Sequence, residues 1–225
     1  MSHTTVPAWR QPTEGESRLA AGSAIVVVIA FQWLLPGKLL PQPAWILPLL
    51  EAACLVILMI ANPSRLSRAE PWVRGLSLVL AGVITIATIV STVRLIDTIV
   101  AGTADKSASV LLGSGAMIWA TNVLAFSLWY WEFDRGGPAA RANGIEPEPD
   151  FLFPQMQDPQ NKLVSKDWRP EYFDYLYLSF TNAASFAPAD VLPLSRWCKM
   201  MMMAQAIISL ALTAMVISRA INILK

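Results

Sequence analysis

Long apolar runs alternate with short polar breaks along the whole chain. Leu, Ile, Val and Ala fill each run on every side of the helix that it would form, as expected when lipid surrounds the helix. Crossing about 30 Å of hydrocarbon takes roughly 20 helical residues. The pattern therefore predicts five transmembrane helices, at residues 19–35, 44–61, 72–100, 109–131 and 194–224.

The breaks between these runs divide the chain into three regions. Residues 1–131 hold the first four predicted helices. Residues 132–170 are rich in Pro, Asp, Glu and Gln, which predicts a surface excursion and not a second folded domain. Residues 171–225 hold an aromatic segment followed by the last helix. The fold class that follows is an all-α integral membrane protein.

The segment at residues 172–194 does not fit the pattern of the five predicted helices. It is aromatic, but it is too short and too polar to span a bilayer, and it ends in a turn of small residues and prolines that carries one carboxylate, Asp190. A long apolar helix follows at once. This order predicts a re-entrant hairpin, in which irregular backbone at membrane depth must be surrounded by protein or by a water-filled cavity.

This last quarter of the chain resembles the pore domain of potassium channels. In an ungapped placement Ser179 and Phe180 end the pore-helix-like segment, Asp190 falls on the terminal Asp of the filter, and Pro193-Leu194 fall on the Pro-Leu that opens the inner helix. The resemblance implies a homo-oligomeric pore, by analogy a tetramer, that passes ions such as monovalent cations. The whole chain also resembles a group of small bacterial membrane proteins with a degenerate pore-loop ending, which implies a bacterial inner membrane.

The chain departs from the potassium-channel pattern in the filter itself. Ala187 and Ala189 stand where the filter has glycines, and Pro188 replaces its tyrosine. Those glycines permit the backbone conformations that aim carbonyl groups at the ion, and a β-carbon penalises them. The sequence therefore predicts a pore-like loop without a potassium-type filter.

Four polar residues of this segment are candidates for an ion pathway, namely Thr181, Asn182, Ser185 and Asp190. Around an oligomer axis their oxygens could attract or coordinate cations. Alternatively they satisfy the hairpin's own backbone, with Asp190 capping the next helix or pairing with Arg196. The first possibility predicts a cation-conducting channel, and the second a non-conducting membrane scaffold or accessory subunit that keeps a relic pore hairpin.

The last helix offers a check on these alternatives. If the protein forms a pore, a polar stripe of that helix should face water, either Ser209, Thr213 and Ser218 or another stripe of the same helix. Asn122 in the fourth predicted span is expected to hydrogen-bond to a neighbouring helix instead of a substrate.

Charged residues inside the predicted spans are a second group of candidates. Glu51 lies within the second span, and intramembrane carboxylates are rare and often functional. Arg94 is a possible partner, and Asp97, one turn further on, could join them. The three residues predict a structural charge pair or an ion relay, but Arg94 could instead extend to the membrane interface.

Composition and charge support the membrane class and exclude several chemistries. Of the 225 residues 55% are hydrophobic and 15% charged, and the mean hydropathy is +0.47. The net charge of +1 does not suggest a nucleic-acid partner. The chain has two cysteines, both in apolar helical contexts, and one histidine in the polar N-terminal tail, and it contains no phosphate-binding loop or nucleophile elbow. We therefore expect no enzyme activity, no cofactor and no metal site, and a lipid bilayer as the main partner.

The distribution of Lys and Arg predicts the orientation. The short loop after the second span carries Arg65, Arg68 and Arg74, whereas the loops on the opposite side carry few basic residues. Basic residues favour the cytoplasmic side of short loops. The N-terminus is therefore expected in the cytoplasm.

Overall fold

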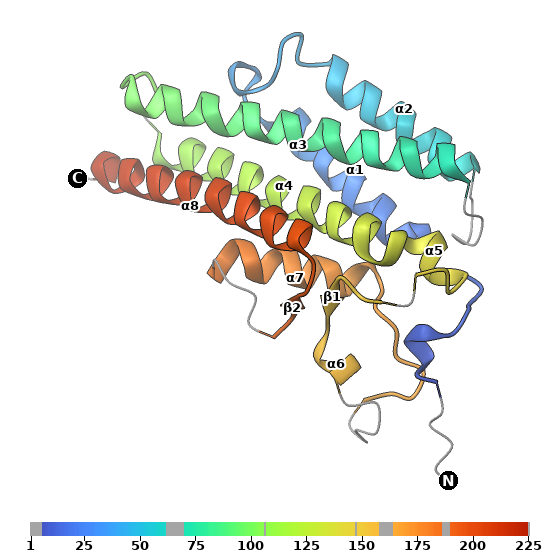
Figure 1. Cartoon of the computed structure of the whole chain (residues 1–225). Helices are drawn as coiled ribbons and strands as arrows, with labels where there is room; N and C mark the ends of the chain where they lie inside the picture. Colours follow the sequence, from blue (N-terminus) through green and yellow to red (C-terminus); the bar gives the residue numbers. More distant parts are fainter. Residues whose placement is uncertain are drawn as a thin grey trace.

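A computed structural model of the chain describes residues 6–61, 70–105, 107–146, 148–157, 164–185 and 190–224. Five long helices match the five apolar runs: α1 (Arg18–Leu34), α2 (Ile46–Ala61), α3 (Pro71–Val100), α4 (Ala108–Phe133) and α8 (Arg196–Leu224). They lie side by side in one elongated bundle (Figure 1). The only strands among the described residues are β1 (Phe151–Leu152) and β2 (Leu192–Pro193), so the prediction of an essentially all-helical protein is confirmed.

Three helices, α3, α4 and α8, are long and apolar enough to cross a membrane. This supports the prediction of a membrane protein. The other two apolar helices are shorter, with 17 residues in α1 and 16 in α2. At about 1.5 Å per residue each is roughly 25 Å long.

Local sequence explains where several of these helices begin and end. The hydroxyl of Ser17 accepts a hydrogen bond from the backbone N–H of Leu19 at 3.2 Å and caps the start of α1. Pro71 occupies the first turn of α3, where its missing N–H costs nothing. Gly102, just beyond α3, has φ +71°, a left-handed conformation that glycine adopts without a steric penalty.

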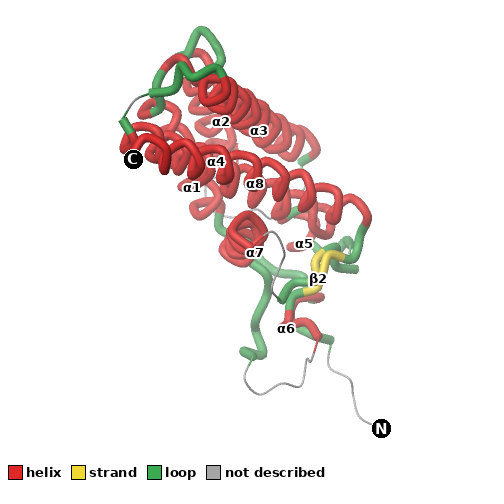
Figure 2. Tube along the Cα trace, turned by 90° about the vertical axis from the view of Figure 1, so that its left-hand side faces the viewer, coloured by secondary structure: helices red, strands yellow, loops and turns green. Residues whose placement is uncertain are grey.

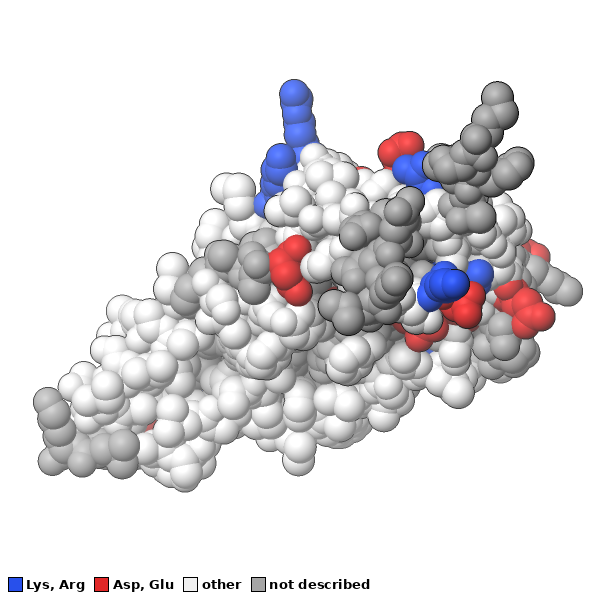
Figure 3. Space-filling view, turned by 90° about the horizontal axis from the view of Figure 1, so that it is seen from below, with Lys and Arg blue, Asp and Glu red and all other residues white. Residues whose placement is uncertain are grey.

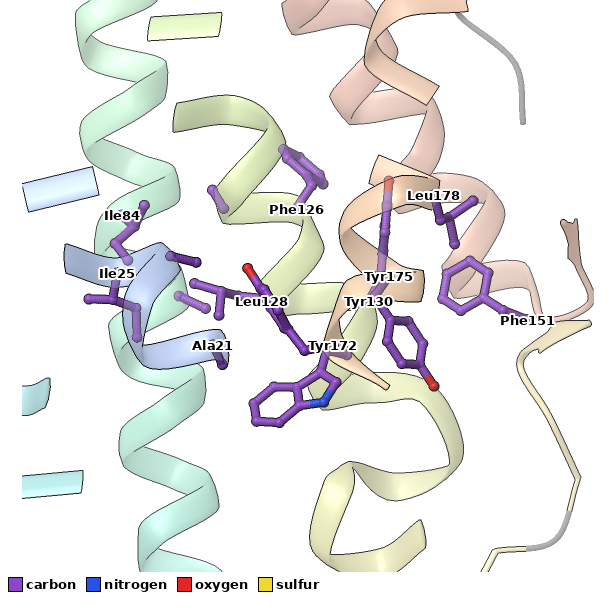
Figure 4. Packing of buried hydrophobic residues seen from close by; sticks show 14 of the residues in the cluster. Ala21, Ile25, Ile84, Phe126, Leu128, Tyr130, Phe151, Tyr172, Tyr175 and Leu178 are labelled. Carbon is purple, nitrogen blue, oxygen red and sulfur yellow. The ribbon is translucent and has the colours of Figure 1, made fainter. Parts of the chain in front are cut away.

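Helix α4 forms the centre of the bundle, with α1, α3, α7 and α8 packed around it. Figure 2 shows α7 (Tyr172–Ser185) as a shorter helix against one side of the longer ones. The core between α4 and α7 is aromatic, and Tyr130, Tyr172 and Tyr175 lie there together with Phe151 (Figure 4). The ring of Phe151 makes an edge contact with that of Tyr130, with 5.1 Å between the ring centroids.

Part of the region predicted as a surface excursion folds onto one end of the bundle. It contains the turn η3 (Asp134–Gly136) and the short helices α5 (Pro138–Ala142) and α6 (Pro154–Gln157). Strand β1 pairs with β2 in antiparallel register, Phe151 opposite Pro193 and Leu152 opposite Leu192. This pairing connects the segment to the start of α8. Phe151 and Phe153 also anchor it, because both are buried in the main core.

Charged side chains gather at this same end. On the face seen from below, the blue and red side chains lie mostly over one half of the molecule (Figure 3). On this face the distribution is that of a bundle with one end in water and an apolar body in lipid.

Candidate functional site

Helix α7 holds most of the residues that the sequence proposes for an ion pathway. One of them, Asn182, is 2% exposed and lies against α8. Its amide nitrogen donates to the backbone carbonyl of Met202 at 3.0 Å and to Oε1 of Gln205 at 2.7 Å. Both N–H donors of the Asn182 side chain therefore bind acceptors inside the protein.

Gln205, in the middle of α8, is the centre of this network and is fully buried. Its Oε1 accepts from the hydroxyl of Tyr130 at 2.6 Å as well as from Asn182. Its Nε2 donates to the backbone carbonyl of Ser179 at 3.0 Å and to the Ser179 hydroxyl oxygen at 2.7 Å. One side chain thus joins α4, α7 and α8 through four hydrogen bonds.

Two serines extend the network on either side of Gln205. The hydroxyl of Ser209 donates to the carbonyl of Ala183 at 2.6 Å and accepts from the indole N–H of Trp119 at 2.8 Å. The hydroxyl of Ser179 donates to the carbonyl of Val123 at 2.6 Å. We call the residues Tyr130, Ser179, Asn182, Gln205 and Ser209 the polar seam. It closes the interfaces between α4, α7 and α8 in a single copy of the chain.

Asn122 lies beside the polar seam. Its amide nitrogen donates to the backbone carbonyl of Gln205 at 3.4 Å, which confirms the predicted bond to a neighbouring helix. The Asn122 Oδ1 is buried and has no hydrogen-bond partner. Asn122 therefore adds one donor contact to the α4–α8 interface.

The remaining ion-pathway candidates lie at or beyond the end of α7. The hydroxyl of Thr181 donates to the carbonyls of Tyr177 and Leu178, both at 3.0 Å, one turn back on its own helix. Ser185 and Asp190 are exposed. The filter-like residues 187–189 lie outside the described part of the chain.

The intramembrane charges have separate partners. Gln32 of α1 donates through Nε2 to Oε1 of Glu51 at 2.8 Å, and Oε2 of Glu51 is buried without a hydrogen-bond partner. Arg94 instead donates to the backbone carbonyl of Leu40, in the segment between α1 and α2. Asp97 is exposed. The structure does not bring Glu51 and Arg94 together.

A double-mutant cycle tests this separation. We expect Glu51→Gln and Arg94→Gln to change the free energy of unfolding in detergent additively, within about 0.5 kcal/mol, because the two side chains share no partner. Glu51→Gln alone should not lower stability, since an amide keeps an oxygen to accept from Gln32 and removes a buried carboxylate. A coupling energy above about 1 kcal/mol would show that the two charges interact.

A second polar cluster, at the charged end of the bundle, has Asp134 at its centre. The fully buried carboxylate accepts from the hydroxyl of Tyr175 at 2.6 Å and from the backbone N–H groups of Asp150 at 2.9 Å and Phe151 at 3.2 Å. It therefore connects the end of α4 to both α7 and β1. The sequence placed Asp134 in the predicted surface excursion of residues 132–170.

Arg141 in α5 completes this cluster. Its guanidinium binds the carboxylate of Glu16 at 2.9 and 3.0 Å and donates to the carbonyls of Trp131 and Asp134 at 2.7 and 2.8 Å. Burial opposes the charge on Arg141, but the Glu16 carboxylate, with Tyr175 and Asp134 nearby, outweighs burial and raises the pKa of the guanidinium above its ordinary value. The N-terminal segment is thereby fixed to the bundle.

Among the residues that the structure describes, no group of three or more His, Cys, Asp or Glu side chains is placed to hold a metal ion. No protein-family model, no curated protein and no solved structure matches the chain. The geometry of the polar seam and of the charged end is therefore the basis for a functional proposal.

Proposed function

We propose that the chain is a five-span membrane protein that serves as a non-conducting scaffold or accessory subunit, with α7 as a packing element of its bundle. The supporting observation is the polar seam. Its side chains on α7 and α8 form hydrogen bonds with each other, within one copy of the chain. In a pore the same groups would be free to bind water and ions. Here these groups instead hold α7 against α4 and α8.

The proposal places all five long helices across the bilayer with the N-terminus in the cytoplasm. The charged end of the bundle, with Glu16, Asp134 and Arg141, would then lie at the cytoplasmic face. Helices α1 and α2 are short for a full crossing, but Pro, Gly and Trp residues next to them can lie in the interfacial region.

A scaffold also needs a surface for its partner, and we assign this role to the outer face of α7. Phe173, Tyr177 and Phe180 follow one another at helical spacing and are 73%, 47% and 49% exposed. The opposite face of the same helix holds the buried Tyr172, Tyr175 and Ser179. The polar seam holds α7 in place, and the helix presents a row of exposed aromatic side chains. Such a row suits contact with a helix of another membrane protein.

An ion-flux assay tests whether the protein conducts. Purified protein in liposomes should give K⁺ and Na⁺ flux no greater than empty liposomes do, because the polar side chains of the seam are paired within one chain. Asp190→Asn should leave this result unchanged. Cation flux that falls in the Asp190→Asn variant would refute the scaffold proposal and support a channel.

Site-specific photo-crosslinking in cells tests the partner surface. A photoreactive phenylalanine analogue at Phe173 or Tyr177 should give a discrete protein adduct, whereas the same analogue at Ile86, which is 64% exposed on α3, should not. Adducts at neither α7 position, or equally at Ile86, would contradict the assignment.

The second candidate is a pore between several copies of the chain. It is favoured by the exposure of Ser185 and Asp190 at the end of α7, where both could face a shared axis. A crosslinked adduct of twice the mass of one chain, together with flux in liposomes, would favour this candidate.

A further inference from the structure

A pocket of about 440 Å³ opens at the charged end of the bundle, beside the start of α3. The start of α1, the first turns of α3, the end of α4 and the turn leading into α5 form its walls. Apolar side chains cover most of these walls, among them Val73, Leu78, Pro138 and Ile145. The volume is within the range of roughly 300–1,000 Å³ that is typical of small-molecule sites.

Charged residues also lie among these apolar walls, among them Arg18, Arg74 and Glu132. Arg18 is 5% exposed, and its Nε is buried without a hydrogen-bond partner. Glu132 is 4% exposed, and no ion pair within 4.0 Å joins it to Arg18 or Arg74 among the residues that the structure describes. The buried Nε of Arg18 would gain a partner from an anionic group of a ligand. The Glu132 carboxylate interacts with Arg18, Arg141 and Arg74 at longer range and is hydrogen-bonded to the Ser77 side chain, so it supplies the negative charge of the pocket.

Gly137 leaves space beside both Arg74 and Glu132 in one wall of the pocket. Gly137 has φ +94°, and a β-carbon at this position would lie 2.8 Å from the backbone oxygen of Glu132. It would also lie 3.5 Å from Oε2 of Glu132 and 3.7 Å from Nε of Arg74. The glycine therefore leaves the space in which a cationic and an anionic side chain approach one pocket.

Helix α3 also carries an exposed apolar row outside the pocket lining. Trp72, Val79, Ile86 and Val93 follow at seven-residue intervals and are 50–64% exposed. They give α3 an apolar surface for lipid, on a face of the helix separate from the pocket.

We propose that the pocket binds the phosphoethanolamine headgroup of a membrane phospholipid. Arg18 and Arg74 bind the phosphate, because guanidinium groups match the geometry of phosphate oxygens. Glu132 binds the ammonium group, and Glu70 and Glu146 add negative charge to the lining. Because the lining carries both signs, a zwitterionic head with an ammonium group fits it better than the anionic head of phosphatidylglycerol does.

Binding of defined lipids to the purified, delipidated full-length protein tests this proposal. Native mass spectrometry and thermal stability should show retention of phosphatidylethanolamine and stabilisation by it, with weaker effects of phosphatidylglycerol and phosphatidylcholine of the same acyl chains. Arg74→Gln should weaken phosphatidylethanolamine binding about tenfold, as expected for one lost charge-assisted contact. Arg74 is exposed, so this substitution should leave the bundle folded.

Lys38→Gln is the matched control, because it removes the same charge at an exposed position outside the pocket lining. It should leave lipid binding unchanged. Equal binding of the three lipids, or equal effects of Arg74→Gln and Lys38→Gln, would overturn the proposal. Soluble phosphoethanolamine and inorganic phosphate form a further arm, and binding of either as tightly as the lipid would show that the ligand is a soluble phosphate compound.

Discussion

Gln205→Leu is expected to lower the free energy of unfolding in detergent by about 3 kcal/mol. Leucine fills a similar volume, so the loss arises from the four hydrogen bonds of the Gln205 side chain and not from a cavity. Hydrogen bonds between membrane helices contribute roughly 0.6 kcal/mol each, and the stranded Tyr130 and Asn182 donors add a desolvation cost. Thermal or SDS-induced unfolding of the purified protein measures the change.

The control for Gln205→Leu is Met203→Leu on the same helix. Met203 is 63% exposed, so this substitution should change stability by no more than about 0.5 kcal/mol. If Gln205→Leu is as stable as the parent protein, the seam does not hold α7 in place.

Asp134→Ala is expected to have the largest effect, a loss of about 4 kcal/mol. It removes the acceptor of three buried hydrogen bonds and leaves the Tyr175 hydroxyl and two backbone N–H groups without a partner. Breaking a buried charged network from one side costs about 3–5 kcal/mol. The same unfolding assay measures the loss, and limited proteolysis should show cleavage of the 148–157 segment as β1 detaches.

Asp134→Asn should lie between the parent and Asp134→Ala, since one oxygen remains to accept from the backbone of Asp150 and Phe151. The exposed Asp97→Ala provides the control for loss of a carboxylate and should be near neutral. A loss below about 1 kcal/mol in Asp134→Ala would mean that the charged end is not a stabilising element.

The helices of this protein could be predicted from the sequence because lipid exposure needs long uninterrupted apolar runs. The predicted residues 109–131 correspond to Ala108–Phe133 in the structure, and residues 194–224 correspond to Arg196–Leu224. The capacity to cross a membrane is shown for α3, α4 and α8. For α1 and α2 the span stays a prediction, because their helical lengths are marginal.

Side-chain partners could not be predicted in the same way. Gln205 binds residues 26 and 75 positions away, and periodicity does not tell which neighbour a polar residue in an all-apolar helix will face. A glutamine in the middle of a predicted span was nevertheless a signal that sequence reasoning passed over, since such residues commonly bond across helices. Glu51 and Arg94 are possible partners only in that both are charges inside predicted spans, and this does not determine which helices touch.

The contacts at the charged end could not be predicted from the sequence for a different reason. Asp134 and Arg141 belong to the predicted surface excursion, yet they bind Tyr175 and Glu16, which lie 41 and 125 residues away. Contacts of that separation depend on the packed bundle, which a one-dimensional pattern does not contain. The pocket beside Arg18 and Arg74 depends on the same packing.

The scaffold proposal requires that the α7–α8 interface is packed and free of water. The accessibility of residue 209 to a water-soluble reagent tests this requirement directly. In a protein with Cys54→Ala and Cys198→Ser, Ser209→Cys changes one atom of the side chain and can be probed with a water-soluble methanethiosulfonate. We expect no modification of the cysteine at position 209 in membranes and full modification after denaturation, because Ser209 is completely buried against Ala183 and Trp119. Rapid modification of the folded protein at this position would place water in the interface and contradict the account.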